Sequence, residues 1–174
     1  AASDVYKRQL QFSAKVIRCE SVSDQDDSSE TAWSVILDKT GFYPESGGQL
    51  CDQGNLGNAH VLHVGIHEGV ITHTVDRPLA LGSITGKINQ SRRNQISQHH
   101  TSVHIVGGSA RKILGSHIWQ AGSYKSEDLA RLDITHFNRL TRDQLDEIED
   151  HANTIVTDNP VSYTHLTLPT TDRV

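Results

Sequence analysis

The first half of the chain carries short runs in which apolar and polar residues alternate, the period of a β-strand with one buried face. Phe12, Ala14 and Val16 alternate with polar neighbours in the first run. His67-Glu68-Gly69 separates two further runs and predicts the turn of a hairpin. A polar loop is expected at Gln25–Glu30. Such strands predict a small barrel or sandwich, with strands expected at residues 12–16, 33–38, 60–66, 70–75 and 83–88.

Near Gln90 the pattern changes to helical spacing. The predicted helix ends at Gly115, because glycine readily adopts the left-handed conformation found just past a helix end. Gly107-Gly108 inside the helix costs about 1 kcal/mol per glycine relative to alanine. Either a bend or a close packing contact is therefore expected there. The residues that follow this helical spacing are Ile96, His100, Val103, Ala110, Ile113 and Leu114.

Two further strands are expected at residues 118–124 and 130–137. Thr141 and Gln144 then have the spacing of a capping box, which predicts the start of a helix. The apolar positions of this second helix are Leu145, Ile148, Ala152 and Ile155.

The two ends of the chain are related to each other. A DNA sequence that encodes residues 1–9 has a reverse complement whose translation matches residues 161–168. We interpret residues 1–9 and 161–174 as non-native, adapter-like tails around a native part of about Leu10–Pro160. The alternative is two natural polar tails that match by accident.

Composition narrows the class of protein. A chain of 174 residues suits one domain or two small ones. Its formal charge of −5 argues against a generally basic nucleic-acid surface, although a local basic patch stays compatible with it. The two cysteines are too few for a disulfide framework, and no apolar run is long enough to span a membrane. We expect a reducing, cytoplasmic location.

His100 and His104 lie four positions apart, which places both imidazoles on one face of the predicted helix. Zn²⁺ accepts two such nitrogens. The His-Glu-x-x-His pattern of metalloproteases is absent, because no glutamate lies between the two histidines. A chance or structural pair is the alternative in a chain with 11 histidines.

The second informative stretch is Thr40–Gln49, which contains Gly47-Gly48-Gln49. Adjacent glycines allow positive φ and a close backbone approach to a ligand. Gln49 offers a carbonyl acceptor and two amide donors, and Thr40 offers a hydroxyl. Taken alone, the stretch also fits a glycine-rich turn after a strand. Gly-Gly-Gln also occurs in peptide release factors, but nothing else in the chain fits them.

Together these stretches resemble the editing region of alanyl-tRNA synthetase. The similarity covers nearly all of Leu10–Pro160 and looks most like the archaeal enzymes. Free-standing alanyl-tRNA editing proteins share this region. The matching runs are residues 40–49, Cys51-Asp52-Gln53-Gly54, Arg92-Arg93, His100–His104, His117–Gly122, Arg131–His136 and Ile148–Asn153.

The resemblance implies an α+β fold, with a small β-barrel at residues 10–89 followed by a two-layer α/β editing core at residues 90–160. It also implies hydrolysis of mischarged seryl- or glycyl-tRNA(Ala). A pocket that accepts alanine cannot exclude the smaller glycine and only weakly rejects an added hydroxyl, so a second site must remove the errors. The whole protein would ligate alanine to tRNA(Ala) with ATP, in a domain upstream of this region.

The resemblance also assigns residues. Thr40 would hydrogen-bond the serine hydroxyl, and Gln49 would position the substrate or the water, with Gly47 and Gly48 in the substrate-binding loop. Thr40 as a strand-end turn residue is the alternative. His100 and His104 would bind zinc together with a later Cys-x-x-x-His.

That second ligand pair is absent from this chain, which predicts an incomplete zinc site and little deacylase activity. Arg92-Arg93 would meet the tRNA backbone, with solvated surface charge as the alternative.

Two other functions stay open: a free-standing editing hydrolase that never ligates, and an inactive tRNA-binding module.

Trp33 and Trp119 are expected in the core. Surface or structural roles are expected for His60, His63, His67, His73, His117 and His151.

Overall fold

The computed structural model describes residues 10–22 and 32–158. The polar loop expected at residues 25–30 and both adapter-like ends lie outside these ranges. Within the described part, every helix is too short or too polar to cross a lipid bilayer.

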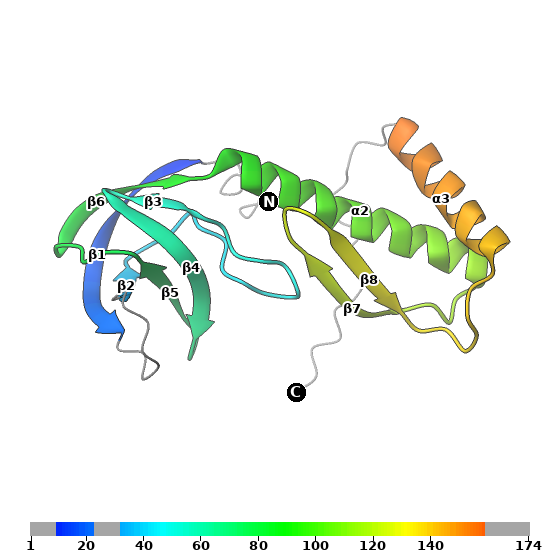
Figure 1. The fold of residues 1–174 in the computed structure, drawn as a ribbon, viewed down its shortest axis with the longest axis horizontal. Coiled ribbons are helices and arrows are strands. Elements are labelled where there is room, and N and C mark those ends of the chain that lie inside the picture. The colour runs from blue at the N-terminus through cyan, green and yellow to red at the C-terminus, as the bar shows by residue number, and fades with distance from the viewer. Residues whose placement is uncertain (1–9, 23–31, 159–174) are drawn as a thin grey trace. The chain divides into compact units, whose positions relative to one another are not determined.

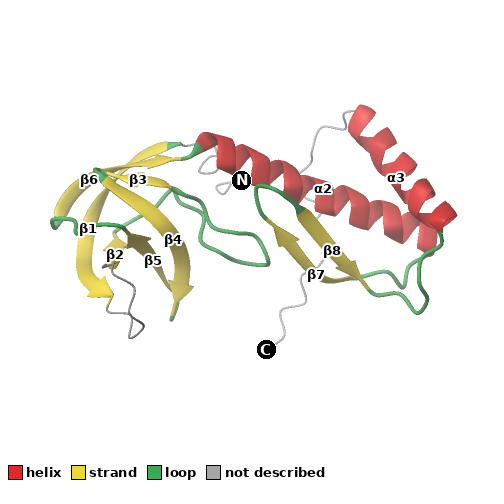
Figure 2. Ribbon diagram, in the orientation of Figure 1, coloured by secondary structure: helices red, strands yellow, loops and turns green. Residues whose placement is uncertain are grey.

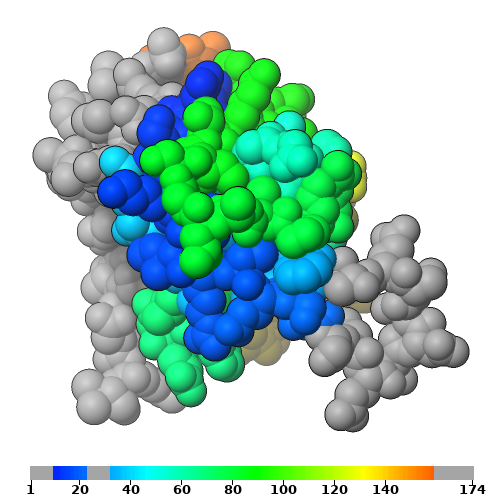
Figure 3. Space-filling view, turned by 90° about the vertical axis from the view of Figure 1, so that its left-hand side faces the viewer, coloured from blue at the N-terminus to red at the C-terminus, as the bar shows by residue number. Residues whose placement is uncertain are grey.

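Six antiparallel strands close into a barrel in the order β1-β2-β5-β4-β3-β6 (Figure 1). Of the two architectures that the alternating pattern allowed, the barrel is therefore the correct one. Figure 3 shows β1 in blue beside β6 in green on the barrel's outer face, which agrees with their pairing. The strands are β1 (Gln11–Val22), β2 (Ala32–Leu37), β3 (Gly54–Leu56), β4 (Ala59–His67), β5 (Val70–Val75) and β6 (Gly82–Ile88).

The barrel interior is filled by the apolar side chains that alternate along these strands. Val35, Leu56, Val64 and Val75 are fully buried, and Trp33 packs against them as expected.

Strand β3 was not predicted from the sequence. It has three residues, too few to show a period, and it exists because both of its edges pair, with β4 and with β6.

Strand β4 contains a β-bulge. Its register against β5 shifts between Val61 and His63. A bulge adds one unpaired residue and re-aims the side chains around it. Val61 and Val64 consequently both point into the core, whereas Leu62 and His63 are both exposed.

The second half contains α2 (Gln90–Leu114), the paired strands β7 (Gln120–Lys125) and β8 (Ala130–Ile134), and α3 (Arg142–Thr157) (Figure 2). Helix α2 ends at Gly115, which has a φ of +115°, so this prediction is confirmed. Its Gly107 lies in a packing contact, since a Cβ there would sit 3.5 Å from a methyl carbon of Leu132.

The capping box of α3 is confirmed. The side chain of Thr141 accepts a hydrogen bond from the Gln144 backbone, and the Gln144 side chain accepts one from the Thr141 backbone. Such a cap satisfies amide groups at the first turn that have no partner inside the helix.

The chain divides into two compact units. The first consists of Ala1–Thr101 and Gly122–Arg131 and holds the barrel, and the second consists of Ser102–Ala121 and Leu132–Val174. Ala110, Ile118 and Ile148 form the core of the second unit.

Trp119 was expected in the core, and that expectation is wrong, because its side chain is 48% exposed. Its ring instead lies under the guanidinium of Arg111, 4.2 Å from the ring centroid. A cation over an indole face is a favourable arrangement that keeps one side of the ring in water.

Arg92 and Arg93 are not solvated surface charges, because each is only 8% exposed. Arg93 forms an ion pair with the buried Asp52 and donates to the Gly41 carbonyl at 2.7 Å. Arg92 pairs with Glu127 and donates to the Cys51 carbonyl at 3.1 Å. The two guanidinium groups therefore connect the start of α2 to the loop that follows β2.

We predict that Asp52→Asn lowers the free energy of unfolding of the barrel by about 3 kcal/mol, because it leaves the buried Arg93 charge uncompensated. The measurement is urea denaturation followed by Trp33 fluorescence, with Trp119 replaced by Phe in every variant. Glu20→Gln is the matched control, since it removes one partner of the exposed Arg18–Glu20 pair. The control is expected to change stability by less than about 0.5 kcal/mol. Equal losses in both variants would contradict the prediction.

Candidate functional site

The glycine-rich stretch lies in the loop between β2 and β3, the cyan loop of Figure 1. Backbone hydrogen bonds hold this loop in place. The Glu45 amide donates to the Val64 carbonyl at 2.8 Å, and the Leu50 amide donates to the Lys125 carbonyl at 3.0 Å. Within the loop, the Asp52 amide donates to the Tyr43 carbonyl at 3.0 Å. The loop is therefore tied both to the barrel and to the end of β7.

Gly47 and Gly48 both have positive φ, of +57° and +72°. At Gly48 glycine is also required by space, because a Cβ would lie 1.8 Å from the Ser123 carbonyl oxygen. The Lys125 amide donates to the Gly48 carbonyl at 2.7 Å. Gly48 thus permits a close backbone approach to strand β7, and the approach to a ligand that the sequence suggested stays a prediction.

The Lys125 side chain is buried beneath this turn. Its ammonium group donates to the Gly47 carbonyl at 3.0 Å and to the Ser123 hydroxyl at 2.7 Å. Burial lowers the pKa of Lys125 below its usual value, because the charged form loses solvation. In the sequence, Lys125 is marked only by its place in the segment that joins the strands expected at residues 118–124 and 130–137.

Gln49 and His100, predicted separately from two motifs, are brought together by the fold. The Oε1 atom of Gln49 lies 2.9 Å from Nδ1 of His100 on α2. Because Oε1 can only accept, Nδ1 carries the proton in this contact, and the lone pair of the neutral ring is then on Nε2. The neighbouring His99 contacts the Ser126 carbonyl at 2.7 Å through its own Nδ1.

His104 lies one turn after His100 on the continuous helix α2, and its side chain is exposed. Among residues 10–22 and 32–158, the cluster of three potential metal-binding side chains is elsewhere, at Glu45, Cys51 and His63. Neither His100 nor His104 belongs to it. Zinc binding by the two predicted histidines therefore stays a prediction.

Thr40 contacts a histidine that the sequence pattern did not single out. His73 is buried on β5, its Nδ1 donates to the Val35 carbonyl at 3.2 Å, and its Nε2 lies 2.9 Å from the Thr40 hydroxyl. With Nδ1 protonated, Nε2 is the acceptor and Thr40 donates. The Thr40 oxygen also accepts from the Phe42 amide at 3.1 Å.

Strand alternation contained a signal for His73, since it shares the inward-facing parity of Ile71 and Val75. Burial lowers its pKa below the ordinary value, because the protonated ring would lose solvation.

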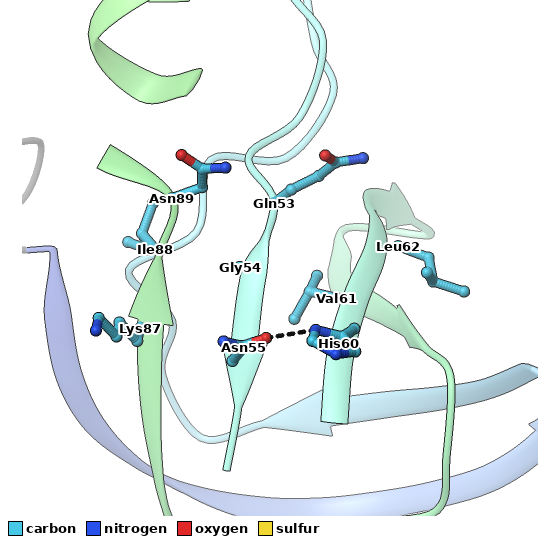
Figure 4. A pocket seen from close by; sticks show the side chains of 9 residues that line it. All are labelled: Gln53, Gly54, Asn55, His60, Val61, Leu62, Lys87, Ile88 and Asn89. Carbon is cyan, nitrogen blue, oxygen red and sulfur yellow. Dashed lines mark hydrogen bonds between the residues drawn. The ribbon is translucent and has the colours of Figure 1, made fainter. Parts of the chain in front are cut away.

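Thr40 and His73 line a hollow of about 310 Å³ on the barrel, which also includes Lys39 and Val70. A second hollow, of about 460 Å³, is shown in Figure 4 and contains none of the predicted site residues. Its polar edge includes a hydrogen bond of 2.7 Å between Asn55 and His60. Thr40 thus lies at an open hollow on the barrel, whereas Gln49 contacts His100 on α2.

Several of the remaining histidines have partners inside their own units. His117 and His136 stack with ring centroids 5.1 Å apart and share a hydrogen bond of 2.9 Å. His63 contacts Glu45 at 3.1 Å. These pairs are formed by residues distant in sequence, so spacing along the chain could not reveal them.

Residues 1–92 match the sequence profile of the family described as tRNA synthetases class II (A). This match covers more than half of the 174 residues. The chain therefore belongs to the class II (A) tRNA synthetase family.

The chain is also similar to alanine–tRNA ligases that are much longer than itself. It is 43% identical over 136 residues to the alanine–tRNA ligase of Methanosarcina barkeri, covering 72% of this chain and 15% of that protein. The corresponding values are 44%, 79% and 15% for Natronomonas pharaonis, and 38%, 86% and 16% for Nitrosopumilus maritimus. These relatives confirm the archaeal-like resemblance to alanyl-tRNA synthetase. The matched region spans about one sixth or less of their length.

We predict that Gly48→Ala disrupts the loop, because the new methyl group collides with the Ser123 carbonyl and breaks the contact with β7. The expected loss is above about 2 kcal/mol of unfolding free energy. Gly47→Ala is the matched control, since its φ is also positive but open space surrounds it, and about 1 kcal/mol is expected from backbone strain alone. Amide hydrogen exchange of Lys125 reports the loop contact and should accelerate strongly only in Gly48→Ala. Similar exchange in both variants would contradict this account.

We predict that the barrel loses stability as pH falls below about 6.5, the ordinary histidine pKa, because the unfolded chain then binds a proton at His73 that the folded chain does not. Above that pH both states are neutral at this ring and the contribution vanishes. Urea denaturation across pH 7.5 to 5 should show a smaller acid loss in His73→Gln than in the unsubstituted chain. His67→Gln, at an exposed position of β4, is the control and should retain the full loss. An unchanged pH profile in His73→Gln would refute the assignment.

Proposed function

We propose that this chain is the editing part of an alanyl-tRNA synthetase and hydrolyses the ester of seryl- or glycyl-tRNA(Ala). The observation that carries the proposal is the contact of Gln49 with His100. The two residues are 51 positions apart and come from the two motifs that define the resemblance. The similarity to alanine–tRNA ligases supports the same assignment.

Ester hydrolysis requires a held carbonyl, a positioned water and stabilisation of negative charge on the carbonyl oxygen. With its own carbonyl engaged by His100, Gln49 presents its amide group as a donor to the substrate or the water. The Lys125 ammonium, held under Gly47, adds positive charge beside the same turn. These groups can orient an aminoacyl ester and favour the developing charge.

Thr40 is proposed to select for serine. Its hydroxyl donates to His73, so it presents an acceptor lone pair at the edge of the hollow that it lines. A serine hydroxyl can donate to this oxygen, whereas the alanine methyl group cannot. The hydrogen bond that serine gains here contributes about 0.5–1.5 kcal/mol, which favours serine over alanine.

Zinc at His100 and His104 is part of this proposal. The donor set fits the metal, because zinc favours imidazole nitrogen and the Nδ1 proton directed at Gln49 fixes the ring tautomer in which Nε2 is the nitrogen able to bind a metal. Two histidines are fewer than the usual three or four ligands. When bound, zinc would supply a Lewis acid or an anchor for the substrate amine.

The ligation of alanine to tRNA(Ala) with ATP is proposed for the longer protein, and a cytoplasmic location is proposed with it. The relatives are ligases, which favours this assignment over a free-standing editing hydrolase.

A role of Arg92 and Arg93 in binding the tRNA backbone stays a prediction. Their buried ion pairs support a structural role.

We predict that the chain hydrolyses seryl-tRNA(Ala) slowly and in preference to alanyl-tRNA(Ala), and that Gln49→Ala reduces the rate about tenfold or more, because a positioning group is lost. Single-turnover deacylation with excess protein measures both rates. Gln53→Ala, an exposed glutamine a few residues along the loop, is the control and should leave them unchanged. Hydrolysis no faster than in buffer, an absence of preference for seryl-tRNA(Ala), or equal rates for Gln49→Ala and the unsubstituted chain would each refute the proposal.

A further inference from the structure

Three side chains of types that bind metals converge on the outside of the barrel. A carboxylate oxygen of Glu45, the Sγ atom of Cys51 and a ring nitrogen of His63 all lie within 4.8 Å of one another. Glu45 and Cys51 come from the loop after β2, and His63 comes from β4. The proposed editing function uses none of these three side chains.

The fold builds this convergence from several independent features. The bulge in β4 places His63 on the outer face instead of in the barrel interior. Gly65 leaves room for the imidazole, because a Cβ there would lie 3.0 Å from Cε1 of His63. The hydrogen bond from the Glu45 amide to the Val64 carbonyl holds the loop against the same strand.

Cys51 is the fixed member of the group. It is only 4% exposed, whereas the side chains of His63 and Glu45 are 52% and 47% exposed. One side of the cluster therefore rests on the protein and the other opens to solvent. A metal ion bound there can keep a water molecule as a further ligand.

We propose that Glu45, Cys51 and His63 bind a divalent cation of the zinc class, with water completing a tetrahedral site. Zinc takes thiolate sulfur at about 2.3 Å and imidazole nitrogen or carboxylate oxygen at about 2.0–2.2 Å. In a tetrahedral site such ligand atoms lie roughly 3.3–3.8 Å apart, which is inside the 4.8 Å within which all three atoms already lie. The thiolate and carboxylate charges balance the charge of the ion.

The ligand types also select against other ions. Mg²⁺ and Ca²⁺ favour sites made of oxygen atoms, whereas thiolate and imidazole favour zinc and its neighbours. Arg92 is a nearby cation, but its guanidinium is paired with Glu127 and its charge is therefore compensated. The site therefore suits a borderline-soft dication.

The same three residue types could also form a nucleophilic cysteine site, but the environment argues against it. A nucleophilic cysteine must be reached by its substrate, and Cys51 is only 4% exposed. A metal ion can be reached from the solvent side through the exposed side chains of Glu45 and His63.

The test is a titration of the metal-free full chain with Co²⁺, which substitutes for zinc and gives a near-ultraviolet charge-transfer band when a thiolate binds it. One equivalent of Co²⁺ should produce this band, and zinc should remove it by displacement. Cys51→Ser should abolish the band. His63→Asn and Glu45→Gln, at exposed positions that should leave folding intact, should each weaken Co²⁺ binding at least about tenfold.

Two controls distinguish this site from the second cysteine and from the histidines of α2. Cys19→Ser, which removes the other cysteine of the barrel, should retain the band. A double variant, His100→Asn with His104→Asn, should also retain it, so failure of the zinc site proposed for editing does not affect the result. The proposal is overturned if the unsubstituted chain gives no thiolate band, if the band persists in Cys51→Ser, or if it disappears in the double histidine variant.

Discussion

The arrangement of the first unit depends on the buried ion pair between Arg93 and Asp52. Asp52 ends the glycine-rich loop and Arg93 lies in the first turn of α2, so the pair connects the loop to the helix that carries His100. Both charges are removed from water, and each would be strongly unfavourable without the other. The second arginine, Arg92, strengthens the connection by binding the Cys51 carbonyl and Glu127.

Around this connection, small backbone features decide which side chains come close enough to one another to form a site. Gly48 allows the loop to reach β7, which places Gln49 next to His100. The bulge in β4 moves His63 outward to Cys51 and Glu45. A hydrolytic site and a metal site can therefore share one loop, with one group of side chains directed to α2 and the other to the barrel wall.

The fold was largely predictable from local patterns. Strand alternation located five of the six barrel strands, and the helices were marked by Gly115 and by the Thr141–Gln144 capping box. These signals succeed because periodicity and caps are properties of neighbouring residues. Strand β3 was missed because its pairing partners, not its own three residues, determine it. Trp119 was wrongly expected in the core, because aromatic residues are buried on average but not at every position. Here the Arg111 guanidinium covers one face of its ring.

The sequence by itself determined the β-to-α order of the elements, the resemblance to alanyl-tRNA synthetase and the residues Thr40, Gln49, His100 and His104 as candidates. Only the tertiary structure decided that Gln49 meets His100, that Thr40 binds His73, and that Arg92 and Arg93 are buried and ion-paired. The reason is physical: an ion pair or hydrogen bond between residues dozens of positions apart depends on how the strands close and where a bulge falls. Neither the bulge at His63 nor the closure of the barrel leaves a periodic trace in the chain.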